Sequence, residues 1–385
     1  MTEPAQPAVS ESPSSQGWST KKWVTNIAGG LILAIGLRVL VSFEDRLPSF
    51  GVVLPTYTLG FLVAVFVHEL GHLVAALLVR FEVVTFAAWP VVAHRSGQRW
   101  KLGVWRPGRF SIGGFVSACP LGTHDLVKRM LWITAGGPAA SWTLVIVAAV
   151  LVVFLEGGSQ SWVSTLLTAL VFWSALIGII SLVSHSGKHA LSDGSRIRML
   201  RRGGPEAERF VCIMILLAKS MRGQRPRDWD PELVRRAATH LDYSPDSMSG
   251  QVLRYNWLHD SRQLEEAGPL AEWIAGRIQS REGQQAWQFE VAWFKARHRA
   301  DLPAARQWFD RAGGPGRSPA IRCAYFKAKA AIDLAEQRWL DAAAAARAVA
   351  IESDKISLVG VASAIRDEAE ELLRDVESAK ASAQA

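Results

Sequence analysis

Cysteine is scarce in this chain of 385 residues. The three cysteines, Cys119, Cys212 and Cys323, are far apart and show no C-x-x-C spacing. An odd number at such distances excludes a disulfide framework and a zinc cluster built on thiolates. We therefore interpret the cysteines as small apolar residues that fill space.

Basic residues are missing from the start of the chain. Residues 1–17 are rich in Pro, Ser, Glu and Gln and contain no Lys or Arg. A cleavable signal peptide needs a basic region before its apolar core, so none is predicted, and the first apolar segment should be retained. We expect residues 1–20 to form a disordered cytoplasmic tail.

The sequence also lacks a basic patch interleaved with aromatic residues, which a nucleic-acid-binding surface would need. The formal net charge is +8, from 43 Lys and Arg against 35 Asp and Glu. These basic residues flank apolar segments, as they do at the cytoplasmic side of membrane proteins. The charge therefore indicates a lipid bilayer as partner and no nucleic acid.

Apolar residues are concentrated in segments, because the mean hydropathy is +0.13 although 20% of the residues are charged. Crossing a hydrocarbon layer takes about 20 helical residues. Four segments approach or exceed that length: Trp23–Phe43, Leu54–Val79, Met130–Leu155 and Trp162–Ser184. Lys and Arg gather before the first segment, between the second and third, and after the fourth, which predicts that both termini are cytoplasmic.

The rest of the chain completes the predicted fold. Between the second and third segments, Glu82–Val92 and Trp100–Val116 are rich in β-branched and aromatic residues and are separated by a turn-like cluster at 94–98. This pattern predicts a small membrane-associated β-hairpin. We expect an all-α polytopic membrane protein with about four transmembrane helices, comprising residues 21–202, followed by a soluble cytoplasmic α-helical domain at 203–385.

A weak repeat occurs in this C-terminal region. Phe294-Lys295-Ala296 recurs as Phe326-Lys327-Ala328, and alanine pairs follow each copy. A period in the low thirties is typical of tetratricopeptide hairpins, which suggests a surface for a protein partner. Ordinary alanine-rich amphipathic helices explain the two imperfect copies equally well.

The strongest chemical motif is His68-Glu69-Leu70-Gly71-His72, inside the second apolar segment. In a helix, residues four apart project from one face, so His68 and His72 can share one metal ion while Glu69 lies beside them as a general base. Two buried histidines satisfied by hydrogen bonds are the alternative. Ionisable groups inside a membrane are costly, and this favours the metal.

A catalytic zinc takes three protein ligands, so one more is needed. Asp193, followed by Gly194 just after the fourth segment, is the strongest candidate, although the pair is also typical of a turn or a helix cap. His185 and His189 lie close by in the sequence as alternative ligands.

These motifs together resemble the site-2 protease family of intramembrane zinc metalloproteases, over about residues 55–200. That family has H-E-x-G-H in one membrane helix, a Gly-Pro element in a later helix, here Gly136-Gly137-Pro138, and a late D-G. The pair Gly113-Gly114 also resembles the glycine pair that precedes the family's Gly-Pro helix.

The resemblance implies Zn²⁺ held by His68, His72 and Asp193, with Glu69 as the catalytic residue. Gly71, Gly136, Gly137, Pro138 and Gly194 would support the site. It also implies peptide-bond hydrolysis in a membrane-protein substrate, in what we expect to be a bacterial inner membrane.

One departure weakens the resemblance locally. Where the family has N-x-x-P ahead of the aspartate, this chain has Ser181 and Ser184. Two other functions remain open: an inactive membrane scaffold whose helical tail binds partner proteins, and a transporter that uses His and Asp as a relay.

Overall fold

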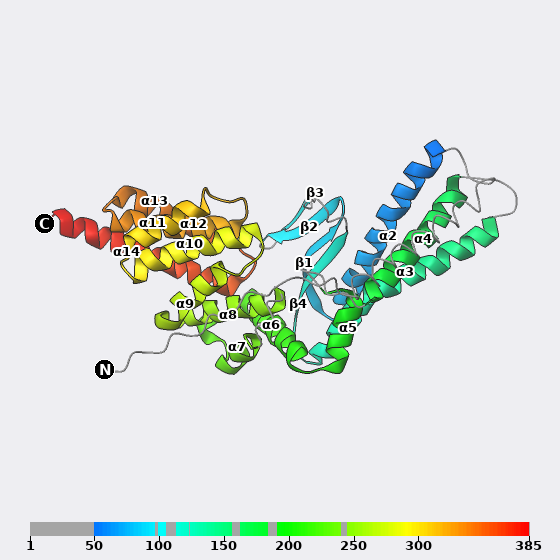
Figure 1. The fold of residues 1–385 in the computed structure, drawn as a ribbon, viewed down its shortest axis with the longest axis horizontal. Helices are drawn as coiled ribbons and strands as arrows, with labels where there is room; N and C mark the ends of the chain where they lie inside the picture. The colour runs from blue at the N-terminus through cyan, green and yellow to red at the C-terminus, as the bar shows by residue number, and fades with distance from the viewer. Residues whose placement is uncertain are drawn as a thin grey trace, which may run out of the picture.

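The computed structural model describes residues 50–96, 99–104, 113–122, 124–155, 162–183, 191–239 and 245–384. The predicted tail at 1–20 and the predicted span Trp23–Phe43 lie outside these residues. Figure 1 shows three long helices at one end of the molecule, a bundle of shorter helices at the other, and a small sheet between them.

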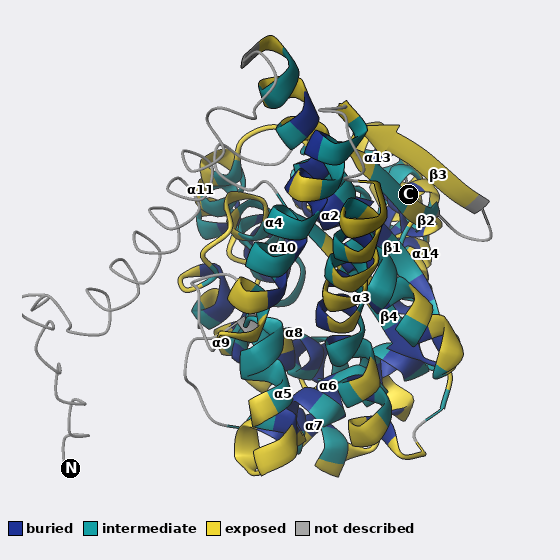
Figure 2. Cartoon of the chain, turned by 90° about the vertical axis from the view of Figure 1, so that its right-hand side faces the viewer, coloured by how far each residue is buried: buried dark blue, intermediate teal, exposed yellow. Residues whose placement is uncertain are grey.

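The three long helices are α2 (Phe50–Leu78), α3 (Leu126–Leu155) and α4 (Trp162–Leu182). They coincide with the second, third and fourth predicted segments, and each is long and apolar enough to cross a membrane. They pack against one another, yet large apolar side chains remain exposed on their outer surfaces, as the exposed positions along α3 illustrate (Figure 2). Such surfaces are suited to contact with lipid.

A close crossing of α2 and α3 brings their backbones together. A methyl group on Gly71 would overlap the carbonyl group of Gly136, and a methyl on Gly136 would approach the Gly71 carbonyl oxygen and the Ala75 side chain just as closely. Small residues at such crossings let membrane helices pack by direct backbone contact. Pro138 lies two residues further along α3 and is buried.

The small antiparallel sheet expected between the second and third segments is present, but it has four strands in the order β3-β2-β1-β4 rather than the two of a hairpin. The strands are β1 (Phe81–Ala88), β2 (Val91–Ser96), β3 (Arg99–Val104) and β4 (Gly114–Pro120). The run 82–92 is two strands, because the chain turns at Trp89 and Pro90. Proline lacks an amide proton for the hydrogen bonds between strands, so Pro90 within residues 82–92 marks the break between the two strands.

Arg129, near the start of α3, connects the sheet to the end of α2. Its guanidinium donates hydrogen bonds to the carbonyl oxygens of Val79 (2.7 Å), Arg80 (2.7 Å) and Gly122 (2.8 Å), and it lies 4.9 Å from the ring centre of Phe81. The last carbonyls of a helix lack partners within the helix. Arg129 therefore stabilises the junction that places the sheet beside the membrane helices.

The C-terminal region is helical. Its elements are α5 (Asp193–Arg202), α6 (Pro205–Met221), η2 (Pro226–Asp228), α7 (Pro231–Ala237), α8 (Pro245–Asp260), α9 (Leu264–Ala275), α10 (Arg281–His298), α11 (Leu302–Ala312), α12 (Pro319–Ala335), α13 (Trp339–Ser353) and α14 (Val359–Gln384). The pairs α10/α11 and α12/α13 pack as hairpins, and α10 packs on α12. The two copies of the Phe-Lys-Ala repeat lie on α10 and α12; the tetratricopeptide likeness stays a prediction.

Helix starts in this region follow from capping residues. Ser280, Asp301 and Ser318 precede α10, α11 and α12, and each side-chain oxygen accepts a hydrogen bond from the backbone N–H three residues on. Such caps satisfy amide groups that have no partner in the first turn. The sequence thus determines locally where these helices begin.

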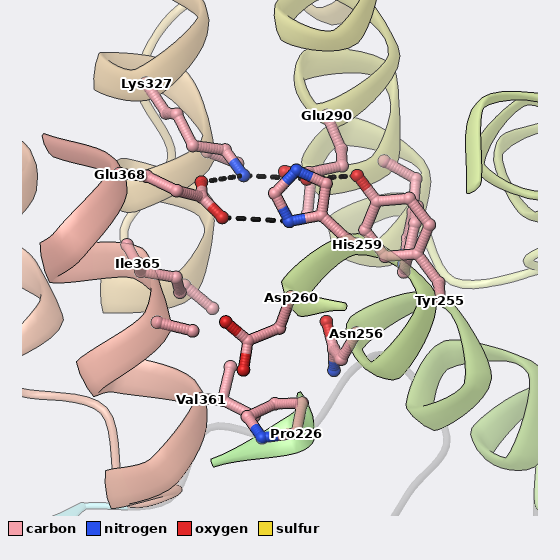
Figure 3. A pocket seen from close by; sticks show the side chains of 15 residues that line it. Pro226, Tyr255, Asn256, His259, Asp260, Glu290, Lys327, Val361, Ile365 and Glu368 are labelled. Carbon is pink, nitrogen blue, oxygen red and sulfur yellow. Dashed lines mark hydrogen bonds and ion pairs between the residues drawn. The ribbon is translucent and has the colours of Figure 1, made fainter. Parts of the chain in front are cut away.

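A buried charge cluster joins four helices of this region (Figure 3). The Lys327 ammonium of α12 lies 2.7 Å from Glu290 of α10 and 3.2 Å from Glu368 of α14. From α8, the Tyr255 hydroxyl donates to Glu290 (2.6 Å), and His259 Nδ1 lies 2.9 Å from Glu368. Buried charges are tolerated only when they are paired in this way.

We predict that Lys327→Met destabilises this helical region by about 3–5 kcal/mol, because two buried carboxylates would lose their shared cation. Unfolding in urea, followed by tryptophan fluorescence, measures the loss. Arg366→Met is the matched control: Arg366 pairs with Asp354 at the surface, so its loss should cost about 1 kcal/mol or less. Equal effects of the two substitutions would contradict the assigned role of the cluster.

The same cluster predicts a loss of stability in acid. Burial by itself would raise the pKa of Glu368, but Lys327 and His259 outweigh it and lower the pKa from 4.5 to about 2. A carboxyl group with a lowered folded-state pKa stabilises the fold above pH 4.5, and this contribution is lost as the pH falls toward about 2. The free energy of unfolding between these pH values should therefore fall more steeply in the unmodified chain than in Glu368→Gln; parallel pH profiles would contradict this.

Candidate metal centre

The histidine motif lies in the second half of α2, and its three ionisable side chains are all buried. His68, Glu69 and His72 are each less than a tenth exposed. The two imidazole rings are neighbours, with centres 4.9 Å apart, as the four-residue helical spacing requires. The helix thus presents two nitrogen ligands and one carboxylate to the same region.

Asp193 reaches the same place from a distant part of the chain. It is the first residue of α5, whose N-cap is Ser192. The Asp193 Oδ2 atom lies 3.3 Å from His68 Nε2 and 3.5 Å from His72 Nε2. The fold therefore brings together the two histidines and the aspartate named from the sequence.

These three residues fit a tetrahedral metal ion. Their ligand atoms all lie within 4.8 Å of one another. Metal–ligand bonds of 2.0–2.1 Å in a tetrahedron place neighbouring ligand atoms about 3.3 Å apart. The observed separations of 3.3 Å and 3.5 Å between Asp193 and the histidines match this value.

The charge of Asp193 suits a cation as well. Burial alone would raise the pKa of this carboxyl group, but hydrogen bonds from His68 and His72 outweigh the burial and lower the pKa to about 2. The aspartate is therefore ionised at neutral pH, which is the form that binds metals.

Two partners on α3 hold the imidazole rings in place. His68 Nδ1 lies 2.9 Å from the Ser141 hydroxyl, and His72 Nδ1 donates to the Ile133 carbonyl oxygen at 2.8 Å. These contacts leave both Nε2 atoms directed at Asp193. The sequence analysis did not identify Ser141. Its position three residues after Pro138, on the helix that crosses α2, is the one sequence feature that could have pointed to it.

Ser141→Ala should weaken metal binding by about 10- to 100-fold, as is usual when a residue that orients a metal-binding histidine is removed. Competition with a chromophoric chelator measures the affinity. Thr143→Ala is the control, because Thr143 is exposed and its hydroxyl donates to the Ala139 carbonyl oxygen of its own helix, away from the histidines. Equal affinities of the Ser141→Ala and Thr143→Ala proteins would show that Ser141 does not orient the ligand.

Three glycines, on α3, β4 and α5, lie where these elements approach the metal centre or its supporting backbone most closely. A side chain at Gly137 would overlap the Nε2 atom of His72, and one at Gly114 would overlap the side chain of Glu69. At the start of α5, a side chain at Gly194 would overlap the carbonyl group of Leu182 at the end of α4. Gly194 therefore lets Asp193 approach α2 from the end of α4.

A cavity of about 530 Å³ opens beside these groups. Glu69 lines it together with His68, His72 and Asp193. Strand β4 forms one wall with Phe115 and Val116. Met130 of α3 and Phe210 and Met214 of α6 form the other apolar walls. A carboxylate base next to a metal site, in a largely apolar cleft, is an arrangement suited to metal-assisted hydrolysis.

The sequence also drew attention to two serines and two further histidines near Asp193. Ser181, one of the two departures from the family pattern, lines the cavity. Ser184 and the alternative ligands His185 and His189 lie outside the described residues. Among the described residues, His68, His72 and Asp193 form the one group of three or more such side chains that could hold a metal ion.

Comparison with known proteins identifies a family for this chain. A model of a protein family described as peptidase family M50 matches residues 56–376, which include most of α2, the sheet, α3, α4 and almost all of the C-terminal helices. No curated protein matches the chain significantly. No solved structure does so either.

Proposed function

The chain belongs to peptidase family M50, the site-2 protease family of membrane-embedded metalloproteases, and from this premise we propose that it is a zinc endopeptidase. It would cleave peptide bonds in or near transmembrane segments of other membrane proteins, as in regulated intramembrane proteolysis. The observation that carries the proposal is the convergence of His68, His72 and Asp193 beside Glu69.

Each residue has a distinct role in this proposal. His68, His72 and Asp193 would hold the ion, and Ser141 and the Ile133 carbonyl group orient the two imidazoles. Bound zinc would supply the acidity that makes a water molecule nucleophilic near neutral pH and would polarise the carbonyl group under attack.

Glu69 transfers the proton. Its carboxylate lines the cavity and adjoins Gly114 of β4, so it lies where a peptide could enter. We propose that it accepts a proton from the attacking water and then donates it to the leaving amine.

Five further residues are proposed to support the site structurally: Gly71, Gly136, Gly137, Pro138 and Gly194.

The substrate would be extended at the cleavage point, because the peptide groups of an intact helix are engaged in internal hydrogen bonds. Strand β4 supports an extended substrate: it is one of the two outer strands of the sheet, and its residues 114–118 line the cavity. An outer strand can pair with an added peptide strand through backbone hydrogen bonds. The apolar wall of the cavity suits side chains drawn from a membrane segment.

Cleavage by the purified chain in lipid vesicles tests the function. The reporter is a single-pass membrane protein with a fluorescent tag at each end. We expect cleavage that stops with a zinc chelator and returns when zinc is restored. The alternative, a catalytically inactive scaffold whose tail binds partner proteins, predicts tight partner binding and no cleavage under any metal condition.

The C-terminal region 203–385 is proposed to be cytoplasmic and to recruit substrate or a protein partner. Its support is the set of stacked helical hairpins, which leave broad helix faces for contact. Because α6 lines the metal cavity, the test is a truncation after Met221, at the end of α6. It should reduce reporter cleavage or change which reporters are cleaved. Unchanged rates and unchanged choice of reporters would remove this part of the proposal.

A further inference from the structure

Arg196 is the cationic side chain in the wall of the metal cavity. The other ionisable residues that line it are His68, Glu69, His72 and Asp193, which the proposed function already uses. Among the described lining residues, Arg196 is therefore the one ionisable side chain without an assigned role.

The position of Arg196 is set by two elements. It lies three residues after Asp193 on α5, so both side chains project from a similar face of that helix, about one turn apart. Its guanidinium lies 4.3 Å from the ring centre of Phe210, a buried residue of α6. Stacking on an aromatic ring holds a guanidinium in place and leaves its edge free to bind a ligand.

The donors of Arg196 are not used within the described part of the chain. No described residue makes a hydrogen bond or an ion pair with its side chain, although a guanidinium carries five N–H donors. This contrasts with Arg129, whose guanidinium is bonded to several backbone carbonyls. Arg196 is thus available to a molecule that enters the cavity.

The chemistry of the cavity identifies the group that Arg196 would bind. Most of the remaining wall is apolar or weakly polar, which strengthens a charge-assisted hydrogen bond relative to one in water. A planar guanidinium matches a carboxylate, with two parallel hydrogen bonds. Resting on the proposed function, we propose that Arg196 is a specificity-determining residue that binds an Asp or Glu side chain of the substrate, within a few residues of the cleaved bond.

A reporter series tests this assignment with the full-length chain in vesicles. Asp is placed at each of several positions on both sides of the cleaved bond, and each reporter has matched Asn and Lys versions. At one position the unmodified protein should cleave the Asp version with kcat/KM about 10-fold or more above the Asn version, mainly through KM. Arg196→Gln should remove this preference, and Arg196→Glu should transfer it to the Lys version.

Arg198→Gln is the matched control, because Arg198 is exposed on the same helix and does not line the cavity. It should keep the preference for Asp. Zinc content, measured on every variant, shows that the metal site is intact. If one Arg196 variant fails to fold, the other still tests whether the preference depends on Arg196, and equal cleavage of the Asp, Asn and Lys reporters by the unmodified protein would still overturn the assignment.

The outcomes separate this inference from the proposed function. Equal, Glu69-dependent cleavage of all three versions at every position would overturn the assignment of Arg196 and leave the protease intact. Retention of the Asp preference by Arg196→Gln would also overturn it. Absence of cleavage of every reporter would instead contradict the proposed function.

Discussion

Glu69→Gln is expected to lower kcat/KM for reporter cleavage by about 10²- to 10⁴-fold, the range that general acid–base catalysis contributes. Glutamine has nearly the same shape as glutamate but cannot take up the proton of the attacking water. The side chain would still fit against Gly114, where a larger group would collide. The substitution therefore removes the proton transfer and little else.

The zinc content of the Glu69→Gln protein should be unchanged, because Glu69 is not one of the three proposed ligands. Initial rates of reporter cleavage in vesicles, with metal analysis of the same preparation, measure both quantities. Glu206→Gln is a suitable control, since Glu206 is exposed in the first turn of α6. A variant that retained full activity with Gln at position 69 would exclude the proposed base.

Asp193→Ala is expected to abolish both zinc binding and cleavage. With His68 and His72 alone, the ion would keep two protein ligands, which is fewer than the three of catalytic zinc sites. The substitution also removes the carboxylate that lies 3.3 Å and 3.5 Å from the two imidazoles. Zinc per polypeptide, measured after equilibration at low free zinc, should fall from about one to near zero.

Asp125→Ala provides the comparison for Asp193→Ala. Asp125 is an exposed acidic residue that lies beside His124 ahead of α3. Its loss should change neither zinc content nor cleavage. If Asp193→Ala kept one zinc per chain and cleaved the reporter, the third ligand would be a different residue, and His185 and His189 would be the first to replace.

Much of the membrane part was predictable because its signals are local. The apolar runs gave α2, α3 and α4 within a few residues, since a helix in lipid must satisfy its own backbone and needs a minimum length. The histidine motif needed only helical periodicity. Asp193 could be ranked above His185 and His189 only through the resemblance to a family, because a D-G pair alone is more typical of a turn or a helix cap.

Other features depend on long-range contacts and could not be predicted in this way. The hydroxyl of Ser141 meets His68 only because α2 and α3 cross at Gly71 and Gly136. The place of Arg196 in the cavity depends on the packing of α5 against α6. The four strands of the sheet, by contrast, could have been predicted locally, because Pro90 in the sequence already marks the turn between β1 and β2.

The cluster around Lys327 shows the same limit in the C-terminal region. Its members lie on four helices spread over more than a hundred residues, and each would pass for a surface charge in the sequence. Only the packing of α8, α10, α12 and α14 brings them together. Burial of charge is thus a property of the fold that composition does not reveal.

X-ray absorption at the zinc edge of the purified, full-length protein reports directly on the atoms that bind the metal. We predict one bound zinc with two imidazole nitrogens and at least one oxygen as ligands, at about 2.0–2.1 Å. Asp193→Ala should remove this signal. A shell containing sulfur, a single imidazole, or a purified, active protease without a divalent metal would contradict it.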